Sequence, residues 1–156
     1  MAVTADRLTL VRVCALLLVA LSLVPGAAHV SELPNKIALP RDHYMLVQQI
    51  YRGWALFGIL IFAALAATAA QALLLRHQRT AFRLSLSAFL CLAAAQAVFW
   101  LFTYPVNVAS ANWTRIPEDF EAARRQWEYS HAAGAALTGA ALIALILCHV
   151  GARRGD

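Results

Sequence analysis

Four long stretches of the chain are apolar and nearly free of charged residues, and no other feature limits the fold so strongly. Hydrophobic residues make up 62% of the 156 residues and charged residues only 13%, so the chain is far more apolar than a soluble domain. About 20 helical residues cross the roughly 30 Å hydrocarbon core of a bilayer, and backbone groups in lipid must bond within their own segment. We therefore predict helical membrane spans at about residues 8–30, 53–75, 84–104 and 131–150.

These spans predict an all-α protein: a single membrane domain over residues 1–156, built as a four-transmembrane-helix bundle. We expect the second and fourth helices to extend beyond the membrane on the outer side. Asp42 follows Pro40 at a position suited to a helix N-cap, so that helix is expected to run on into the second span. The fourth helix is expected to start at residues 116–119, where a proline and two acidic residues suit a first turn and no helix breaker follows.

Prolines are expected to limit the other two helices. Pro34 and Pro40 are predicted to break the connection after the first span into an irregular crossing, and Pro105 to end the third helix. The reason is that proline lacks the backbone N–H that a helix interior uses.

The first span also has an alternative interpretation. Arg7 and Arg12, the apolar run after them and the small residues 26–28 resemble the three parts of a cleaved signal peptide. The length of the apolar run favours a membrane span instead. The N-terminal sequence of the mature protein would distinguish the two.

Charge indicates how the spans are oriented. The short second connection, RHQRTAFR, has three arginines and no acidic residue, whereas the connections at the opposite ends mix basic and acidic residues. The formal net charge of +5 therefore lies on the side that holds this connection and both termini. Cytoplasmic loops are enriched in Lys and Arg, so we place both termini in the cytoplasm.

The lipid bilayer explains the basic balance without a nucleic-acid partner, because the arginines flank spans and no basic helix is present. Cys14, Cys91 and Cys148 lie within spans and lack C-x-x-C spacing, so each is expected to be a small buried apolar residue. The sequence leaves the oligomeric state open.

Polar and aromatic residues gather at the outer ends of the predicted spans. Tyr44, Gln48 and Tyr51 share one face of the second helix, although an interfacial belt of tyrosines is an alternative. Polar groups in spans are costly and tend to face the bundle or a cavity, so we expect a pocket between the outer helix ends. The residues predicted to face it are His29, Glu32, Tyr44, Gln48, Tyr51, Gln96, Trp100, Asn107, Arg124, Trp127, Glu128 and His131.

The stretch RRQWEYSHAAGAALTG joins the polar and apolar halves of the fourth helix without a break. On a helical wheel its polar residues point in one direction, and the same face continues into the apolar half. This inward face is predicted to hold Arg124, Trp127, Glu128, His131, Ala135 and Thr138. Alanines also recur every fourth position from Ala132 to Ala144, a pattern that lets membrane helices approach closely, so they are expected to pack against neighbouring spans.

YPVN, a helix start and then RRQWEYSH resemble the Pro-x-Asn and Arg-x-x-Trp-x-x-x-His signature of the anthrone-oxygenase-like family of small four-helix membrane proteins. Relatives often carry an arginine soon after the histidine, where this chain has AAGAA. The resemblance implies a four-helix fold in a bacterial cytoplasmic membrane and oxidation of a lipophilic aromatic substrate by oxygen without a bound cofactor. The positions that match the signature are Pro105, Asn107, Arg124, Trp127 and His131.

The residues themselves suit proton abstraction from an activated ring carbon of a small apolar ligand. His131 is expected to be the base, with Glu128 or Glu32 as its orienting partner. Arg124 or Asn107 is expected to stabilise the developing oxyanion. The residues expected to bind a flat substrate are Trp100, Trp127, Tyr51, Gln48 and Gln96.

Two alternatives stay open. Glu128 and His131 have the Glu-x-x-His spacing of di-iron bundles and could form a metal set with His29 and Glu32, but the pattern occurs once, so our first expectation is no metal. The other alternative is a non-catalytic membrane protein whose outer polar network is structural or docks a partner. An open cavity on which these residues converge would favour the enzyme, and mutually satisfied side chains without a void would favour the structural role.

Overall fold

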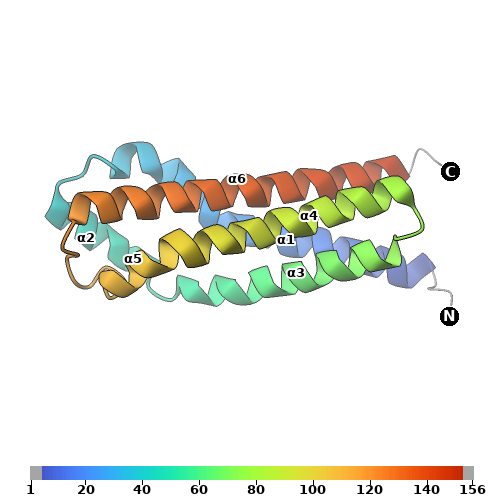
Figure 1. Ribbon diagram of the computed structural model, residues 1–156, viewed down its shortest axis with the longest axis horizontal. Helices are drawn as coiled ribbons and strands as arrows, with labels where there is room; N and C mark the ends of the chain where they lie inside the picture. Colours follow the sequence, from blue (N-terminus) through green and yellow to red (C-terminus); the bar gives the residue numbers. More distant parts are fainter. Residues whose placement is uncertain (1–4, 153–156) are drawn as a thin grey trace.

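The computed structural model describes residues 5–152, and four long helices form its body (Figure 1). They are α1 (Ala5–Lys36), α3 (Phe57–Leu74), α4 (Arg79–Val98) and α6 (Phe120–Ala152). Within the described residues, four segments are long and apolar enough to cross a membrane: Asp6–Lys36, Trp54–Leu74, Arg79–Ala109 and Phe120–Gly151. The predicted all-α, four-span membrane protein is confirmed.

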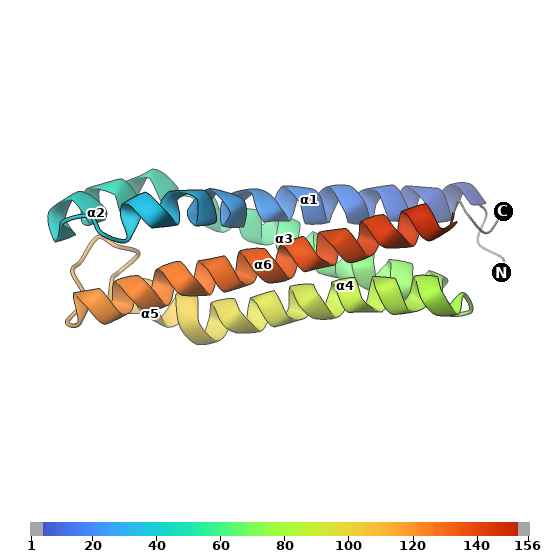
Figure 2. The ribbon, with the colours of Figure 1, turned by 90° about the horizontal axis from the view of Figure 1, so that it is seen from above.

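The four helices pack as an antiparallel bundle. α1 packs along α3 and α6, and α4 packs along the same two helices from the opposite side (Figure 1, Figure 2). α1 begins and α6 ends at one end of the bundle, beside the connection 75–78, and we call this the terminal end. The other end carries α2 (Arg41–Val47), α5 (Tyr104–Ala109) and the turn that leads to α6, and we call it the aromatic end.

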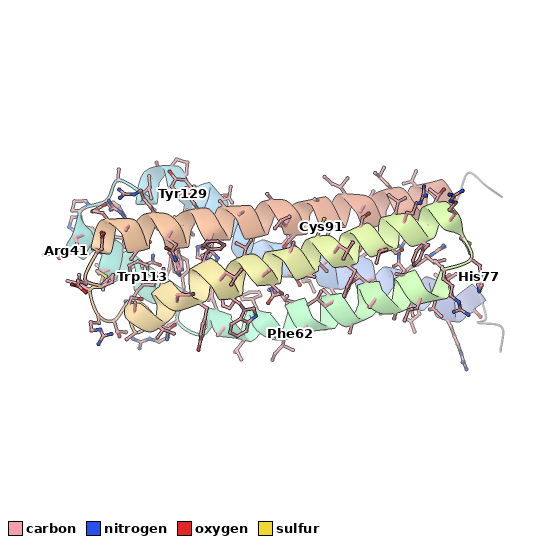
Figure 3. The ribbon with its side chains drawn as sticks, viewed as in Figure 1. Arg41, Phe62, His77, Cys91, Trp113 and Tyr129 are labelled. Atoms are coloured by element: carbon pink, nitrogen blue, oxygen red, sulfur yellow. The ribbon has the colours of Figure 1, made fainter. Side chains whose placement is uncertain are left out.

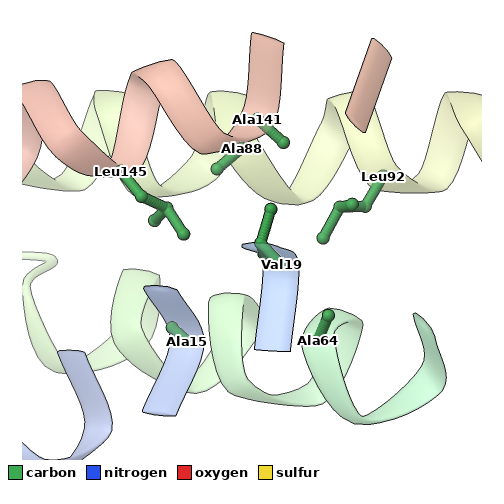
Figure 4. Packing of buried hydrophobic residues seen from close by; sticks show 7 residues of the cluster. All are labelled: Ala15, Val19, Ala64, Ala88, Leu92, Ala141 and Leu145. Atoms are coloured by element: carbon green, nitrogen blue, oxygen red, sulfur yellow. The ribbon is translucent and has the colours of Figure 1, made fainter. Parts of the chain in front are cut away.

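Small side chains let these helices approach closely. Association of helices in lipid depends on van der Waals packing, which small residues favour because they bring the backbones together. Each long helix contributes one fully buried alanine to the core cluster, and three larger side chains fill the space between them (Figure 4). The cluster consists of Ala15, Ala64, Ala88, Ala141, Val19, Leu92 and Leu145.

α6 is one continuous helix of 33 residues, as predicted. It begins directly after Asp119, whose side chain accepts a hydrogen bond from the backbone N–H of Ala122 at 3.0 Å. The predicted packing of its alanine stripe holds only in part, because Ala144 packs against the core cluster and Ala132 is half-buried, whereas Ala136 and Ala140 are exposed. The inward face of α6 follows the polar residues more closely, and its apolar buried positions are Phe120, Trp127, Ala141, Leu145 and Cys148.

The second span is reached through a broken helix rather than the single helix predicted from Asp42 onward. α2 continues as a 3-10 turn, η1 (Gln48–Tyr51), and the chain then turns at Gly53, whose φ of 89° is left-handed. A second 3-10 turn, η2 (Trp54–Leu56), leads into α3. Glycine takes this backbone conformation without the strain that a side chain would add.

Two prolines do not end helices where we predicted. α1 continues through Pro34 to Lys36, and the third span continues through Pro105 to Ala109. Ahead of Pro105 the span contains a π-helix, η3 (Phe99–Thr103), so Pro105 lies in the first turn of α5, where its missing N–H costs little. Membrane helices tolerate proline because neighbouring groups satisfy the freed carbonyl.

A Gly26→Val substitution tests the close contact between α1 and α6. A Cβ at Gly26 would lie 3.1 Å from the Cβ and 3.3 Å from the Cα of Ala135. We expect this overpacking to cost about 1–3 kcal/mol and to lower the midpoint of thermal unfolding in detergent. Gly139→Val is the matched control, because a Cβ there would meet nothing within 4 Å. Equal midpoints in the two variants would contradict a tight contact.

Candidate functional site

A cavity of about 790 Å³ lies between the four long helices toward the aromatic end. Its walls come from residues within 22–29, 57–62, 95–107 and 127–138, and η1 and the turn 111–114 close it at the aromatic end. Trp113 and Phe62, both labelled in Figure 3, mark how far it extends along the bundle. Among the described residues that line it, Arg52 is the one Arg, Lys, Asp or Glu.

Two histidines from different spans meet on the cavity wall. The ring centroids of His29 on α1 and His131 on α6 lie 4.2 Å apart. Aromatic rings surround the pair. The ring centroid of Tyr51 lies 4.4 Å from that of His29, and the ring centroid of Trp127 lies 4.9 Å from that of His29 and 4.2 Å from that of His131. The Nδ1 atom of His29 is buried and forms no hydrogen bond to any described residue.

The residues predicted to bind a flat substrate all line this cavity. They come from three separate segments, namely η1, the third span and α6. Asn107 and His131, two of the predicted catalytic residues, line it as well. The side-chain oxygen of Asn107 accepts a hydrogen bond from Nε1 of Trp127 at 2.7 Å, so these two wall residues hold each other in place. The five predicted binding residues are Tyr51, Gln48, Gln96, Trp100 and Trp127.

Glu128 and Arg124, the other predicted catalytic residues, lie behind the wall and bond to other protein groups. Glu128 is 1% exposed, and its Oε1 atom accepts a hydrogen bond from the Tyr44 hydroxyl at 2.7 Å. Arg124 donates from Nη1 to the carbonyl oxygen of Leu39 at 2.7 Å and pairs with Glu121. The structure therefore does not bring either residue together with His131 at the cavity surface.

Lys36 is the central residue of this buried network, and its role was not predicted from the sequence. It is 3% exposed, its Nζ lies 3.2 Å from Oε1 of Glu128, and it donates to the Tyr51 hydroxyl at 2.7 Å. It also pairs with Glu32, which accepts a short hydrogen bond from Tyr51. The i,i+4 spacing of Glu32 and Lys36 was the one available signal, but it is also typical of an exposed helix pair.

The candidate metal set is divided between two places. His29 and His131 line the cavity, whereas Glu32 and Glu128 both pair with Lys36. Over residues 5–152, no group of three or more His, Cys, Asp or Glu side chains lies close enough to hold a metal ion.

Burial raises the pKa of two tyrosines that lie outside the four spans. The pKa of Tyr44 lies well above its usual range, first because of burial and then because of the Glu128 carboxylate, while Gln48 and Arg124 oppose this in part. Burial and the hydrogen bond to Glu32 raise the pKa of Tyr51 in the same direction. Both phenols therefore remain neutral hydrogen-bond donors at neutral pH.

Part of the cavity wall reaches the surface that faces lipid. Phe62 on α3 and Trp100 on η3 both line the cavity and are 58% and 50% exposed. α3 packs along α4, and among the described residues no comparable packing joins α3 to η3. A lipophilic molecule can therefore reach these rings from the bilayer.

No protein-family model, curated protein or solved structure matches this chain. The features established for it are four apolar spans and a cluster of aromatic side chains at one end of the bundle.

Removal of the Lys36 ammonium group is expected to destabilise the fold. Lys36→Met leaves the buried carboxylate of Glu128 without its cation, which costs about 3–5 kcal/mol in comparable sites. Adding Glu128→Gln should restore much of this loss, and Arg41→Met, at an exposed ion pair, should change little. The midpoint of unfolding in detergent is measured for the wild type, the two single variants and the double variant. A Lys36→Met variant as stable as the wild type would refute the structural role of the pair.

Tyr44 and Tyr51 are expected to stay protonated in an alkaline titration. An unfolded tyrosine ionises near pH 10, so the stability gained from these neutral phenols is complete below about pH 10 and is lost as the pH rises above it. Between about pH 9 and about pH 11 the tyrosinate absorbance change should be equal in wild type, Tyr44→Phe and Tyr51→Phe. In denaturant, where every tyrosine titrates, the tyrosinate absorbance change of each variant should be smaller than that of wild type by the contribution of one tyrosine. A reduced change in a folded variant would show that its tyrosine titrates normally.

Proposed function

We propose that this protein binds a small, flat, lipophilic molecule in the aromatic cavity and that the paired histidines act on it. The observation that carries the proposal is the position of His29 and His131, whose rings lie side by side on the wall of a cavity of about 790 Å³. Binding sites for small molecules are commonly of this size, mainly apolar, and equipped with a few convergent polar groups.

The wall chemistry favours a flat ring system. Trp54, Trp100 and Trp127 present aromatic faces or edges, which pack well against another aromatic ring. A charged ligand would lose its hydration here with one charged side chain, Arg52, among the described lining residues. Access from the bilayer between α3 and η3 also suits a molecule that partitions into lipid.

The chemistry that fits these residues is proton abstraction by His131 from an activated ring carbon. A neutral imidazole can take this proton, and His29, stacked against it, is better placed to orient it than Glu128, which is engaged by Lys36 and Tyr44. The amide nitrogen of Asn107 is left to stabilise the oxyanion that develops.

The reaction implied by the family resemblance then completes the proposal. A ring methylene and molecular oxygen would give a ring carbonyl and water: two C–H bonds and the O–O bond break, and one C=O bond and two O–H bonds form. The methylene carbon is oxidised and oxygen is reduced, so atoms and electrons balance without another co-reactant.

The non-catalytic alternative applies to a different set of residues. Lys36 and Tyr44 both engage Oε1 of Glu128 behind the wall, and Arg124 bonds to the protein backbone, while Oε2 of Glu128 and Nε of Arg124 have no hydrogen-bond partner among the described residues. This supports a structural role for the network, while the cavity in front of it supports ligand binding. We therefore assign Arg124 and Glu128 to the structure and His29 and His131 to the chemistry.

Anthrone, whose central ring holds an activated methylene, is the probe for this function. We expect the purified protein in nanodiscs to bind anthrone and to consume oxygen faster than empty nanodiscs do. His131→Gln should keep the binding and lose most of the rate, about 100-fold or more for a general base. Oxygen uptake with an electrode and binding by calorimetry are the measurements.

Gly134→Phe and Gly139→Phe control for the cavity. Both glycines lie on α6 with nothing within 4 Å of an added Cβ, but only Gly134 lines the cavity. The phenyl ring at position 134 should therefore abolish binding, and the ring at position 139 should not. If the Gly134→Phe variant binds anthrone as tightly as wild type does, the ligand binds outside this cavity. If wild type binds anthrone but consumes no oxygen, the oxygenase assignment is refuted.

A further inference from the structure

Gln96 is a glutamine of the third membrane span that lines the cavity without a protein partner. It lies on α4 and is half-buried. Its amide forms no hydrogen bond to any described residue. Protein atoms enclose the amide atoms of Gln48, whereas those of Gln96 stay accessible. A molecule in the cavity can therefore reach the Gln96 amide.

The position of Gln96 along the bundle differs from that of the two histidines. A hydrogen bond of 2.7 Å between the hydroxyls of Thr103 in the third span and Ser130 on α6 places these two residues at the same level, and His131 follows Ser130 directly. Gln96 precedes Thr103 by about two helical turns, which is about 10 Å along the helix axis. Gln96 therefore lies deeper between the spans than His131 does, and we call the part of the cavity around it the inner end.

The hydroxyl groups that line the cavity within the spans already have protein partners. Those of Ser22 and Thr138 donate to backbone carbonyl oxygens one turn earlier in their own helices, at 2.7 and 2.9 Å. Those of Thr103 and Ser130 bond to each other. A polar group within a membrane span is costly unless it finds a partner, because lipid supplies none. Among the described residues of this inner wall, the amide of Gln96 is the group that still needs one.

The surroundings of Gln96 determine the kind of partner that it can take. The amide supplies two N–H donors and one carbonyl acceptor. Phe62, Phe99 and Trp100 line the cavity as well and add apolar surface, whereas Arg52 follows η1 at the aromatic end. A neutral oxygen atom on an aromatic ring matches this combination. Water offers the same hydrogen bonds, so the test has to separate a bound ligand from a bound water.

We propose that Gln96 hydrogen-bonds to a hydroxyl or carbonyl oxygen of the ligand and so determines which edge of the ring system meets the histidines. This inference rests on the proposed function. An oxygen held at the inner end directs the other edge of a flat molecule toward His131 and His29, whose rings lie 4.2 Å apart. The ligand class is thereby narrowed to flat lipophilic molecules that carry a neutral oxygen substituent. Gln96 is a specificity-determining residue and takes no part in proton transfer.

Naphthalene and 2-naphthol test this role, because they share a ring system and differ by one hydroxyl group. Binding of each to the full-length protein in nanodiscs is measured by calorimetry, with empty nanodiscs subtracted. Gln96→Met keeps a side chain of similar length and removes the amide. The ratio of the Kd for naphthalene to the Kd for 2-naphthol should be about tenfold smaller in Gln96→Met than in wild type, the usual effect of one lost buried hydrogen bond. The Kd for naphthalene itself should not change.

Stability and a matched variant separate ligand recognition from a structural role. Because the Gln96 amide bonds to no described protein group, Gln96→Met should leave the midpoint of thermal unfolding unchanged or raise it. A lowered midpoint would show that the amide stabilises the fold and would refute the proposed role. Gln78→Met is the control, since this glutamine is exposed near the terminal end, and it should keep the wild-type ratio of dissociation constants.

The outcomes for Gln96 and for the proposed function are distinguishable. If both molecules bind and Gln96→Met keeps the wild-type ratio, the amide binds water alone, so the role of Gln96 is refuted and the proposed function stands. If wild type binds neither naphthalene, 2-naphthol nor anthrone, the proposed function and the role of Gln96 are refuted together.

Discussion

The buried ion pair between Lys36 and Glu128 connects the elements of the aromatic end. Lys36 is the last residue of α1, and Glu128 lies in α6. Tyr44 of α2 hydrogen-bonds to Glu128, and Tyr51 of η1 hydrogen-bonds to Lys36. Two charges leave water at a high cost, and only a partner together with further hydrogen bonds offsets it. The network therefore favours one arrangement of these four elements, and the cavity wall in front of it takes its shape from that arrangement.

The polar residues of the aromatic end consequently divide into two groups with different partners. Lys36, Glu128 and Arg124 bond to protein groups, which fixes where the helices lie. The rings of His29 and His131 instead lie on the cavity wall, where a ligand can meet them. A buried network that fixes the helices and a cavity wall that presents rings to a ligand are complementary, since precise positions for the wall residues require rigid support.

The sequence predicted the features that depend on periodicity and composition. The four spans followed from apolar length, and the inward face of α6 followed from the spacing of Trp127, Glu128 and His131. The features it did not predict depend on tertiary contacts. Lys36 belongs to α1 because the helix continues through Pro34, which we expected to break it, and the turn at Gly53 lies inside a segment with helical patterning. The left-handed turn at Trp113 was not predicted, because it depends on a hydrogen bond from the distant Gln49 as well as on the nearby Ser110 hydroxyl.

The π-helix at Phe99–Thr103 is one wide turn within the third span, equivalent to a one-residue insertion in an α-helix. Buried positions recur at Leu92 and Ala95 before it and at Thr103 and Val106 after it. The wide turn takes up one extra residue, so deleting one residue within it would restore a plain α-helix and leave the segment beyond it in nearly the same orientation. Thr103 and Val106 would then still face the bundle. A deletion elsewhere in this span, where no wide turn can take up the change, would instead rotate the residues beyond it by about 100° and turn them away from the bundle.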